Sequence, residues 1–443
     1  MGWDQALLTP GRMPSASDLP DNLYILLHRI DVHCIWVSVP VLSLLPTFPR
    51  PPVAPPGGTI PSPGVFCDNA MDLVLPFLPA PSTAQKREYV MTAQSSLHRY
   101  GIVGLHDAGV RAADRELYSR LASRGQLKLR INAMVECAAR NTFCPAEAAV
   151  VARPDGLLTV HSVKLFADGA LGSWGAALLE PYSDDSTTSG TLLIEPAKLT
   201  NLTRRWAEAG YQVCIHAIGD AASWAAIDAF AAATTAAAGT ASSASDRSRS
   251  KSKGKLSFRL EHAQVVAPVD QARMRTLGIV PSVQPTHATS DSAYALSRLG
   301  GRRLRDSAYR LRSFLPLDVV LGSDFPVEPP SVLAGIYAAV TRRDPRPGMG
   351  KQPSGQTGKG WYTGEALTVK QALRGFTRSP ANAAGLPKAG AIMAGTWADW
   401  VVLDRRLADV GAGEGGGLEW MRSDTAVRET WLHGRRVFMR HRG

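Results

Sequence analysis

The chain has 443 residues, of which 45% are hydrophobic and 20% are charged, a composition typical of a globular protein rather than a disordered one. Its length suits a large barrel with a smaller attached unit. The net charge is +11, but the single run Asp246–Lys255 holds five basic residues against one acidic residue. We interpret this run as a solvated loop, so the charge does not indicate a nucleic-acid partner.

The cysteines and the apolar runs indicate the compartment. Five cysteines without a Cys-x-x-Cys pair argue against a disulfide framework and favour a reducing environment. No run of about 18 apolar residues predicts a membrane helix, and the first residues lack the pattern of a signal peptide. We therefore expect a cytoplasmic protein without a membrane partner. The cysteines are Cys34, Cys67, Cys137, Cys144 and Cys214.

In chain order, the first feature is Val39–Gly64, which holds nine prolines and is predicted to be an extended loop. Short apolar runs then alternate with helix-length segments, as expected for repeated βα units. The predicted strands are Gly101–His106, Leu129–Val135, Val160–Phe166, Tyr211–His216, Ser257–His262, Ile279–Gln284 and Asp318–Gly322. The predicted helices are Gln85–Arg99, Ala112–Ser123, Pro196–Ala209, Ala221–Ala231, Pro268–Thr276, Ser331–Thr341 and Thr368–Thr377.

Seven strands alternating with helices predict an α/β fold, a TIM (β/α)8-type barrel that lacks its first strand. No good strand candidate precedes Gly101 except Leu23–Arg29, which fits an excursion from the barrel better than a barrel strand. Near the carboxyl end, Gly395–Asp404 and Ala426–Phe438 predict antiparallel strands of a partial small β-sandwich unit.

These elements divide the chain into three predicted parts. Residues 1–100 form an N-terminal excursion and a lead-in helix, residues 101–385 the barrel, and residues 386–443 the C-terminal β unit. Within the barrel, the Ala/Thr/Ser-rich and Ser/Arg/Lys-rich stretch at about 232–256 has a composition that cannot offset the entropy of ordering, so we expect a disordered insertion. The Gly/Pro-rich segment Asp344–Gly360 is predicted to be a second long loop.

Four residues that can do chemistry lie at the carboxyl ends of predicted strands. They are Lys164, His216, His262 and Asp324. The carboxyl ends of barrel strands meet at one mouth, so these side chains converge there. Two imidazoles and a carboxylate are suitable ligands for a divalent metal ion. The sequence therefore predicts a metal centre.

Longer phrases around these residues resemble the amidohydrolase superfamily and its YtcJ-like branch in particular. The resemblance runs from about Gly2 to Val437. The phrases that carry it are Lys164-Leu-Phe-Ala-Asp-Gly, His216-Ala-Ile-Gly-Asp, Arg259-Leu-Glu-His-Ala, Val283-Gln-Pro-Thr-His, Gly322-Ser-Asp-Phe-Pro, His28-Arg-Ile-Asp-Val-His, Gly64-Val-Phe-Cys-Asp-Asn and Gly395-Thr-Trp-Ala-Asp-Trp.

The resemblance implies a reaction and a set of roles. A carboxylated Lys164 would bridge metal ions, His216 and His262 would bind a metal ion, and Asp324 would bind or orient the water and move its proton. One or two divalent ions are expected, with zinc typical of the family. The implied reaction is hydrolysis of a non-peptide C–N bond in a small-molecule substrate, which is an amide, a formamide or a cyclic amide.

Other residues are predicted to have supporting roles. His287, His33, Arg29, Trp174 and His106 are candidates for substrate binding, and the loop Gly169–Gly175 is expected to shape access to the site. Arg259, Glu261 and Asp220 are expected to support the site rather than bind the metal ion. An oligomeric assembly is compatible with this sequence.

One departure from the family pattern leaves an alternative open. The family carries a His-x-His pair on its first barrel strand, whereas no two of the ten histidines in this chain are spaced two apart. This departure suggests an N-terminally truncated sequence or a genuine short product. A catalytically impaired or inactive member with a binding or scaffold role is therefore the alternative to an active hydrolase.

Overall fold

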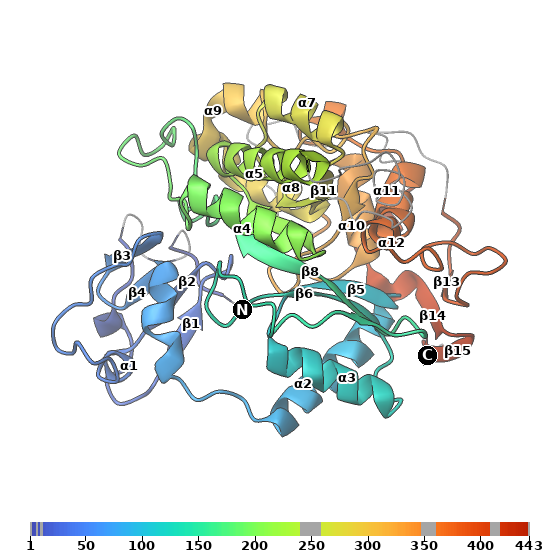
Figure 1. Ribbon diagram of the computed structural model, residues 1–443, viewed down its shortest axis with the longest axis horizontal. Coiled ribbons are helices and arrows are strands. Elements are labelled where there is room, and N and C mark those ends of the chain that lie inside the picture. Colours follow the sequence, from blue (N-terminus) through green and yellow to red (C-terminus); the bar gives the residue numbers. More distant parts are fainter. Residues whose placement is uncertain are drawn as a thin grey trace.

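The computed structural model describes residues 2–5, 8, 12–239, 258–346, 360–407 and 417–441. They form three sheets and a set of helices, with the N-terminal sheet, the central parallel sheet and the C-terminal sheet side by side (Figure 1). The basic run at 246–255 and positions 347–359 of the predicted second loop lie outside the described residues. None of the described helices has the length and apolar character needed to span a membrane.

All seven predicted barrel strands are present and pair in parallel in one curled sheet with the order β12-β11-β10-β9-β8-β6-β5. A short strand, β7, pairs with β8 in the antiparallel sense. The result is a mixed α/β half-barrel. The strands are β5 (Gly104–Val110), β6 (Arg130–Val135), β7 (Val151–Ala152), β8 (Leu158–Phe166), β9 (Gln212–Ala217), β10 (Arg259–His262), β11 (Val280–Val283) and β12 (Val320–Leu321).

The helices cover the outside of this sheet, with α2 and α3 on one side and α4 and α5 on the other (Figure 1). Local signals fix several ends. Ser82 and Gln85 form a capping box at the start of α2, and Gly278 ends α7 in the left-handed region. The helices are α1 (Val39–Leu42), α2 (Thr83–Arg99), α3 (Ala112–Ser123), α4 (Pro196–Glu208), α5 (Asp220–Gly239), α7 (Pro268–Leu277), α8 (Pro285–Ser290), α9 (Ala295–Asp306), α10 (Val332–Thr341), α11 (Val369–Phe376) and α12 (Arg378–Ala383).

The main hydrophobic core lies between the parallel sheet and these helices. Every residue of β6 and β9 is buried, as expected for parallel strands that are covered on both faces. Trp206 of α4 and Phe230 of α5 are fully buried within this core. The core therefore holds the strands in place from outside, while the strand ends remain available for a site.

The N-terminal region contains more regular structure than the sequence predicted. A four-stranded antiparallel sheet has the order β1-β2-β4-β3, and the loop predicted at Val39–Gly64 was wrong at both ends, where α1 and β3 form. Pro61 is tolerated in β3 because β3 is an edge strand with a register shift between Thr59 and Ser62. The strands are β1 (Leu26–His28), β2 (Cys34–Val37), β3 (Gly58–Ser62) and β4 (Val65–Asp68).

The argument against a disulfide framework was also wrong. Disulfide bonds join Cys34 to Cys67 and Cys137 to Cys144, and Cys214 alone is free and buried. The antiparallel pairing of β2 with β4 sets Cys34 directly opposite Cys67, although 33 positions separate them in the sequence. Disulfides persist in oxidising environments, so the argument for a reducing compartment no longer holds.

The predicted insertion at about 232–256 begins later than expected. Helix α5 continues to Gly239, and residues 240–257 lie outside the described residues. Alanine has the best helix propensity of all residues. The alanine-rich part of this stretch therefore extends the helix, although its composition suggested disorder.

At the carboxyl end, the predicted antiparallel strands form a three-stranded sheet of β13 (Trp400–Leu403), β14 (Val427–Leu432) and β15 (Arg435–Met439). Arg130, at the start of β6, joins this sheet to the half-barrel. Its guanidinium donates to both carboxylate oxygens of Asp399, at 2.6 and 3.0 Å, in the bidentate arrangement that gives strong, directional ion pairs.

A polar cluster lies inside the half-barrel. The buried Arg259 donates from Nη1 to Nδ1 of His106 at 2.6 Å and from Nη2 to Ser282 at 3.1 Å. His106 lies in the body of β5, not at the strand end that the sequence predicted. Burial and the nearby Arg259 charge lower the pKa of His106 well below its usual value and that of His161 to about 4. Both imidazoles are therefore neutral at pH 7.

This cluster predicts a pH dependence of stability. Between pH 6.5 and about pH 4, His161 is protonated in the unfolded chain but neutral in the folded one, so stability is lost as the pH falls through this window. His161 alone adds at most about 1.4 kcal/mol per pH unit to this slope. Urea unfolding of the parent chain and of the His161→Asn variant at pH 7 and pH 5 measures it. An unchanged slope in the variant would contradict the burial of a neutral His161.

The disulfides predict a labelling pattern. When the chain is unfolded without a reductant and treated with a thiol reagent, only Cys214 should be alkylated, because the other four cysteines are paired. After reduction, all five should react. Peptide mass spectrometry reads each position separately, and alkylation of Cys34 or Cys67 before reduction would show that the β2–β4 bond is absent.

Candidate metal centre

Three predicted site residues lie at the carboxyl ends of three neighbouring strands. Lys164 is near the end of β8, His216 is near the end of β9, and His262 is the last residue of β10. Parallel pairing of β8 with β9 and of β9 with β10 brings them together. The imidazole centroids of His216 and His262 are 4.4 Å apart. The fold thus brings these three predicted residues to one place.

A buried carboxylate fixes His216. Nδ1 of the imidazole lies 3.1 Å from Oδ1 of Asp168, and Asp168 also accepts hydrogen bonds from the backbone N–H groups of Ala177, Ile218 and Gly219. Nε2 of His216 is buried and has no hydrogen-bond partner within the described part of the chain. Burial, together with the charges of His262 and Lys164, lowers the pKa of His216 well below its usual value. The imidazole is thus a neutral nitrogen donor.

A neutral amide orients His262 in the same way. Its Nδ1 lies 3.1 Å from Oε1 of Gln284, the residue that follows β11. Because an amide oxygen only accepts, Nδ1 carries the proton and Nε2 presents its lone pair. Burial lowers the pKa of His262 to about 4. His262 and Ala263 both have positive φ angles, 69° and 42°, a backbone arrangement that non-glycine residues adopt at a cost.

Lys164 is buried beside these imidazoles. Its side chain is 5% exposed, and Nζ lies 3.9 Å from the centroid of the Phe166 ring. Burial lowers its pKa, an effect that the negative charges of Glu261, Asp324 and Glu136 oppose. The ammonium form is therefore less favoured here than on the surface, which increases the fraction of neutral amine.

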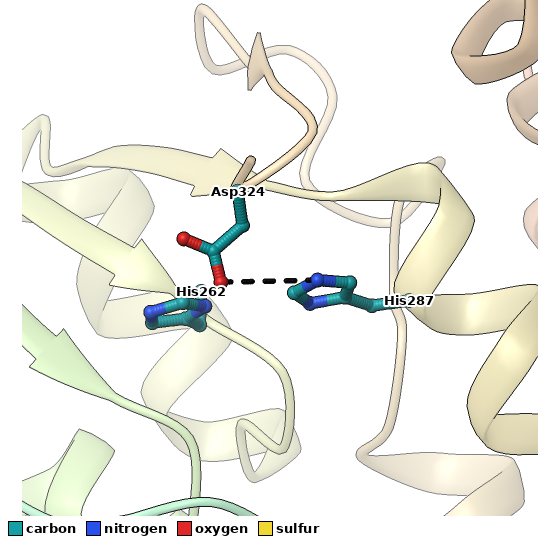
Figure 2. Close-up of side chains that lie close together, drawn as sticks. All are labelled: His262, His287 and Asp324. Carbon is teal, nitrogen blue, oxygen red and sulfur yellow. Dashed lines mark ion pairs between the residues drawn. The ribbon is translucent and has the colours of Figure 1, made fainter. Parts of the chain in front are cut away.

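Asp324 and His287 complete the cluster (Figure 2). Asp324 follows β12 with a φ of 58°, and its side chain is 39% exposed. Nε2 of His287 lies 3.8 Å from Oδ2 of Asp324, and one ligand atom from each of His262, His287 and Asp324 lies within 4.8 Å of the other two. The sequence assigned His287 to substrate binding, whereas the structure brings it to Asp324.

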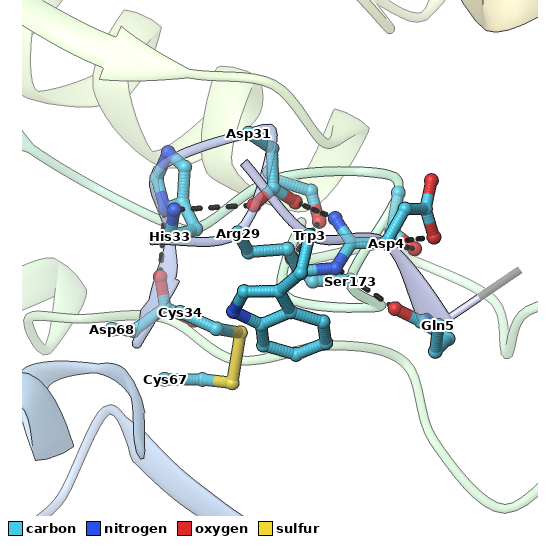
Figure 3. The surroundings of a disulfide bond; sticks show 12 residues. Trp3, Asp4, Gln5, Arg29, Asp31, His33, Cys34, Cys67, Asp68 and Ser173 are labelled. Atoms are coloured by element: carbon cyan, nitrogen blue, oxygen red, sulfur yellow. Dashed lines mark hydrogen bonds and ion pairs between the residues drawn. A yellow bond between two sulfur atoms is a disulfide. The ribbon is translucent and has the colours of Figure 1, made fainter. Parts of the chain in front are cut away.

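His33 reaches this region from the N-terminal sheet (Figure 3). Its Nδ1 lies 2.8 Å from Oδ1 of Asp68, and its ring centroid is 5.3 Å from that of His216. The disulfide joins Cys34, which follows His33, to Cys67, which precedes Asp68. The bond thus ties together the two backbone segments that carry the His33–Asp68 pair.

The remaining predicted residues have several contacts of their own. The buried Arg29 donates hydrogen bonds to Gln5, Asp31 and the carbonyl oxygen of Gly172. These contacts hold the N-terminal segment against the Gly169–Gly175 loop. Trp174, in that loop, donates to Asp184 and stacks under Arg298, whose Cζ is 3.4 Å from the ring centroid. Their assignment to substrate binding stays a prediction.

Sequence reasoning missed the groups that orient the imidazoles. Asp168, Gln284 and Asp68 each lie within phrases that carried the family resemblance, but nothing in a linear sequence tells which histidine each would meet. Glycine in the Gly169–Gly175 loop gives a further signal. A Cβ at Gly169 or Gly175 would lie 2.5 or 2.8 Å from a carboxylate oxygen of Asp68, so the loop packs against this side chain.

The donor chemistry fits a divalent metal ion. Imidazoles that bind metal ions commonly hydrogen-bond their other nitrogen to a carboxylate or carbonyl oxygen, as His216 does with Asp168 and His262 with Gln284. The Nε2 atoms of His216 and His287 are buried and have no hydrogen-bond partner among the described residues. A bound metal ion would give these nitrogen atoms a partner. Nitrogen donors with a carboxylate suit zinc and other first-row divalent ions.

Comparisons with known proteins agree with this chemistry. The chain is 28% identical over 421 residues to the protein named amidohydrolase YtcJ of Bacillus subtilis (strain 168), a match covering 91% of this chain and 73% of that protein. It is 26% identical to the N-substituted formamide deformylase of Arthrobacter pascens, covering 71% and 54%. The crystal structure of an uncharacterized metal-dependent hydrolase from Pyrococcus horikoshii OT3 superimposes with a TM-score of 0.69 at 25% identity, covering 91% and 76%.

The family assignment rests on the widest of these matches. The sequence profile of the amidohydrolase family matches residues 1–438, which include every strand of the half-barrel and the candidate metal centre. The resemblance to the YtcJ-like proteins that the sequence suggested is thereby confirmed. This chain belongs to the amidohydrolase family.

Proposed function

We propose that the chain is a metal-dependent hydrolase that cleaves a non-peptide C–N bond in a small amide, formamide or cyclic amide. The observation that carries the proposal is the meeting of Lys164, His216 and His262 at the ends of three neighbouring strands, with Asp324 close to His262. Both imidazoles are neutral, and each is oriented through Nδ1. The similarity to the N-substituted formamide deformylase of Arthrobacter pascens supports the bond class.

His216 and His262 would hold a divalent ion through Nε2, and zinc is our proposed metal. A bound divalent ion polarises a carbonyl and lowers the pKa of water, which supplies the nucleophile at neutral pH. The lowered pKa of Lys164 favours its neutral amine, the form that reacts with carbon dioxide. A carbamate formed there would add anionic oxygen ligands and would allow a second ion.

Asp324 is the proposed proton carrier. Its carboxylate is 39% exposed at the mouth of the half-barrel, where a substrate can approach, whereas Lys164 and His216 are buried below it. A carboxylate in this position takes a proton from the attacking water and returns it to the leaving nitrogen, which completes the hydrolysis. The Asp168 and Gln284 side chains keep the imidazoles fixed during these transfers.

The role of Asp324 predicts a separation of chemistry from metal content. Asp324→Asn should lower turnover of N-substituted formamides by about 10²–10⁴, the range for loss of a positioned acid–base group, while the chain still contains metal by elemental analysis. Asp185→Asn is the matched control, because Asp185 is an exposed loop carboxylate that hydrogen-bonds Thr187. A parent chain that binds metal yet hydrolyses no amide, formamide or cyclic amide would instead favour the binding or scaffold role.

The orientation of His262 predicts a change in metal affinity. Gln284→Leu removes the acceptor of the Nδ1 hydrogen bond and should weaken zinc binding about 10–100-fold, because loss of such an orienting partner has this typical effect. Competition with a coloured chelator measures the affinity. Gln85→Leu, which changes an exposed amide at the start of α2, should leave it unchanged. Equal affinities in all three chains would exclude an orienting role for Gln284.

A further inference from the structure

The N-terminal region contains a hollow of about 530 Å³. Its base is apolar: Phe66 of β4 and Leu45 are buried, and Leu42 of α1 and Ile60 of β3 pack beside them in the same cluster. Figure 1 shows α1 at the outer edge of the molecule, away from the parallel sheet. The hollow shares no residue with the candidate metal centre.

The size of this hollow exceeds what imperfect packing leaves behind. Protein interiors contain few voids larger than a water molecule, whereas sites for small molecules measure roughly 300–1,000 Å³ and are mostly apolar with a few polar groups. A volume of about 530 Å³ with an apolar base lies within that range. The hollow is therefore large enough for a small organic molecule.

Prolines make up much of the remaining wall. Each proline has a fixed φ angle and no backbone N–H, so these positions are stiff and offer no hydrogen-bond donor. A wall that is already ordered loses little conformational entropy when a ligand binds. The wall thus favours the apolar part of a ligand. The prolines that line the hollow are Pro49, Pro51, Pro52, Pro61 and Pro63.

Arg50 is the one charged residue among the described residues that line the hollow. Its backbone N–H donates to the carbonyl oxygen of Thr47 at 2.8 Å, so a turn holds the guanidinium and the Thr47 hydroxyl on one stretch of the rim. Within the described part of the chain, the Arg50 side chain has neither a hydrogen bond nor an ion pair. An acidic group on a ligand would therefore meet a positive charge that no carboxylate neutralises, together with several N–H donors.

We infer that this hollow binds a small apolar organic acid. The apolar body of the ligand contacts Phe66 and Ile60, and its single carboxylate or sulfonate pairs with Arg50. The stated ligand follows from the combination of an apolar base, a stiff proline wall and one unpaired guanidinium. The inference goes beyond the proposed function and does not depend on it, because it requires neither a metal ion nor hydrolysis.

A matched pair of fluorescent probes tests this inference on the full chain. Anilinonaphthalene sulfonate has an aromatic body and one acidic group, and N-phenyl-naphthylamine is its neutral analogue. Both fluoresce more strongly in apolar surroundings, so a titration gives the affinity of each. We expect the parent chain to bind the sulfonate more tightly than the neutral probe, decanoate to displace the sulfonate, and decylammonium to displace it far less.

Two substitutions connect this binding to the hollow. Arg50→Gln should weaken sulfonate binding about 10-fold or more, as expected for loss of a hydrogen bond to a charged group, and leave the neutral probe unaffected. The control Arg87→Gln changes an exposed arginine of α2 and should alter neither affinity. Thr47→Trp places a bulky side chain at the rim and should weaken the binding of both probes. Thr47 and Arg50 are exposed, so neither change disturbs the core.

The same variants separate the hollow from the metal centre, where a bound ion would also attract an anion. Arg50→Gln leaves every residue of that centre intact, so a loss of sulfonate binding in this variant assigns the probe to the hollow. A parent chain that binds neither probe would overturn the inference. Sulfonate affinity that is equal in the parent, Arg50→Gln and Thr47→Trp chains would also overturn it, because the probe would then bind elsewhere.

Discussion

Parallel pairing of β8, β9 and β10 is the constraint on which the candidate site depends. Each strand pairs with the next through backbone hydrogen bonds, and each contributes one polar residue near its carboxyl end. The core between sheet and helices keeps the strands in register from outside, so a lysine and two histidines meet although nearly a hundred positions separate the first from the last. The same pairing, continued through β11 and β12, brings His287 and Asp324 to the group.

Two buried carboxylates orient the imidazoles of His216 and His33. The Asp168–His216 pair is entirely within the half-barrel, whereas the Asp68–His33 pair comes from the N-terminal sheet, and the centroids of the two imidazole rings are 5.3 Å apart. Asp68 also packs against the backbone of Gly169 and Gly175, the loop that follows Asp168. The N-terminal sheet is therefore one wall of the site, and the Cys34–Cys67 bond stiffens that wall next to His33.

The sequence predicted the periodic part of the fold well. All seven parallel strands and the seven predicted helices are present, because buried strands and amphipathic helices have clear local patterns. Strand β3 was missed because it lies in the proline-rich stretch 39–64, which suggested a loop, whereas an edge strand such as β3 tolerates proline. The Cys34–Cys67 bond depends on which strands pair, which local pattern does not reveal. The alanine-rich end of α5 was mistaken for disorder because composition was given more weight than helix propensity.

The candidate site was predictable to a similar degree. Strand-end positions identified Lys164, His216 and His262, which the fold brings together. The sequence could not tell that Asp168 and Gln284 orient the imidazoles, since each contact joins different βα units. For His287 it suggested the right region, but the distance to Asp324 emerges only when β11 lies between β10 and β12.

X-ray diffraction at the zinc absorption edge, from crystals of the zinc-loaded chain, tests the central claim most directly. The account predicts an anomalous peak about 2.0–2.1 Å from Nε2 of His262, with further imidazole or carboxylate ligands from the neighbouring strand ends. A peak remote from β8, β9, β10 and β12, or zinc bound only at surface residues, would contradict it.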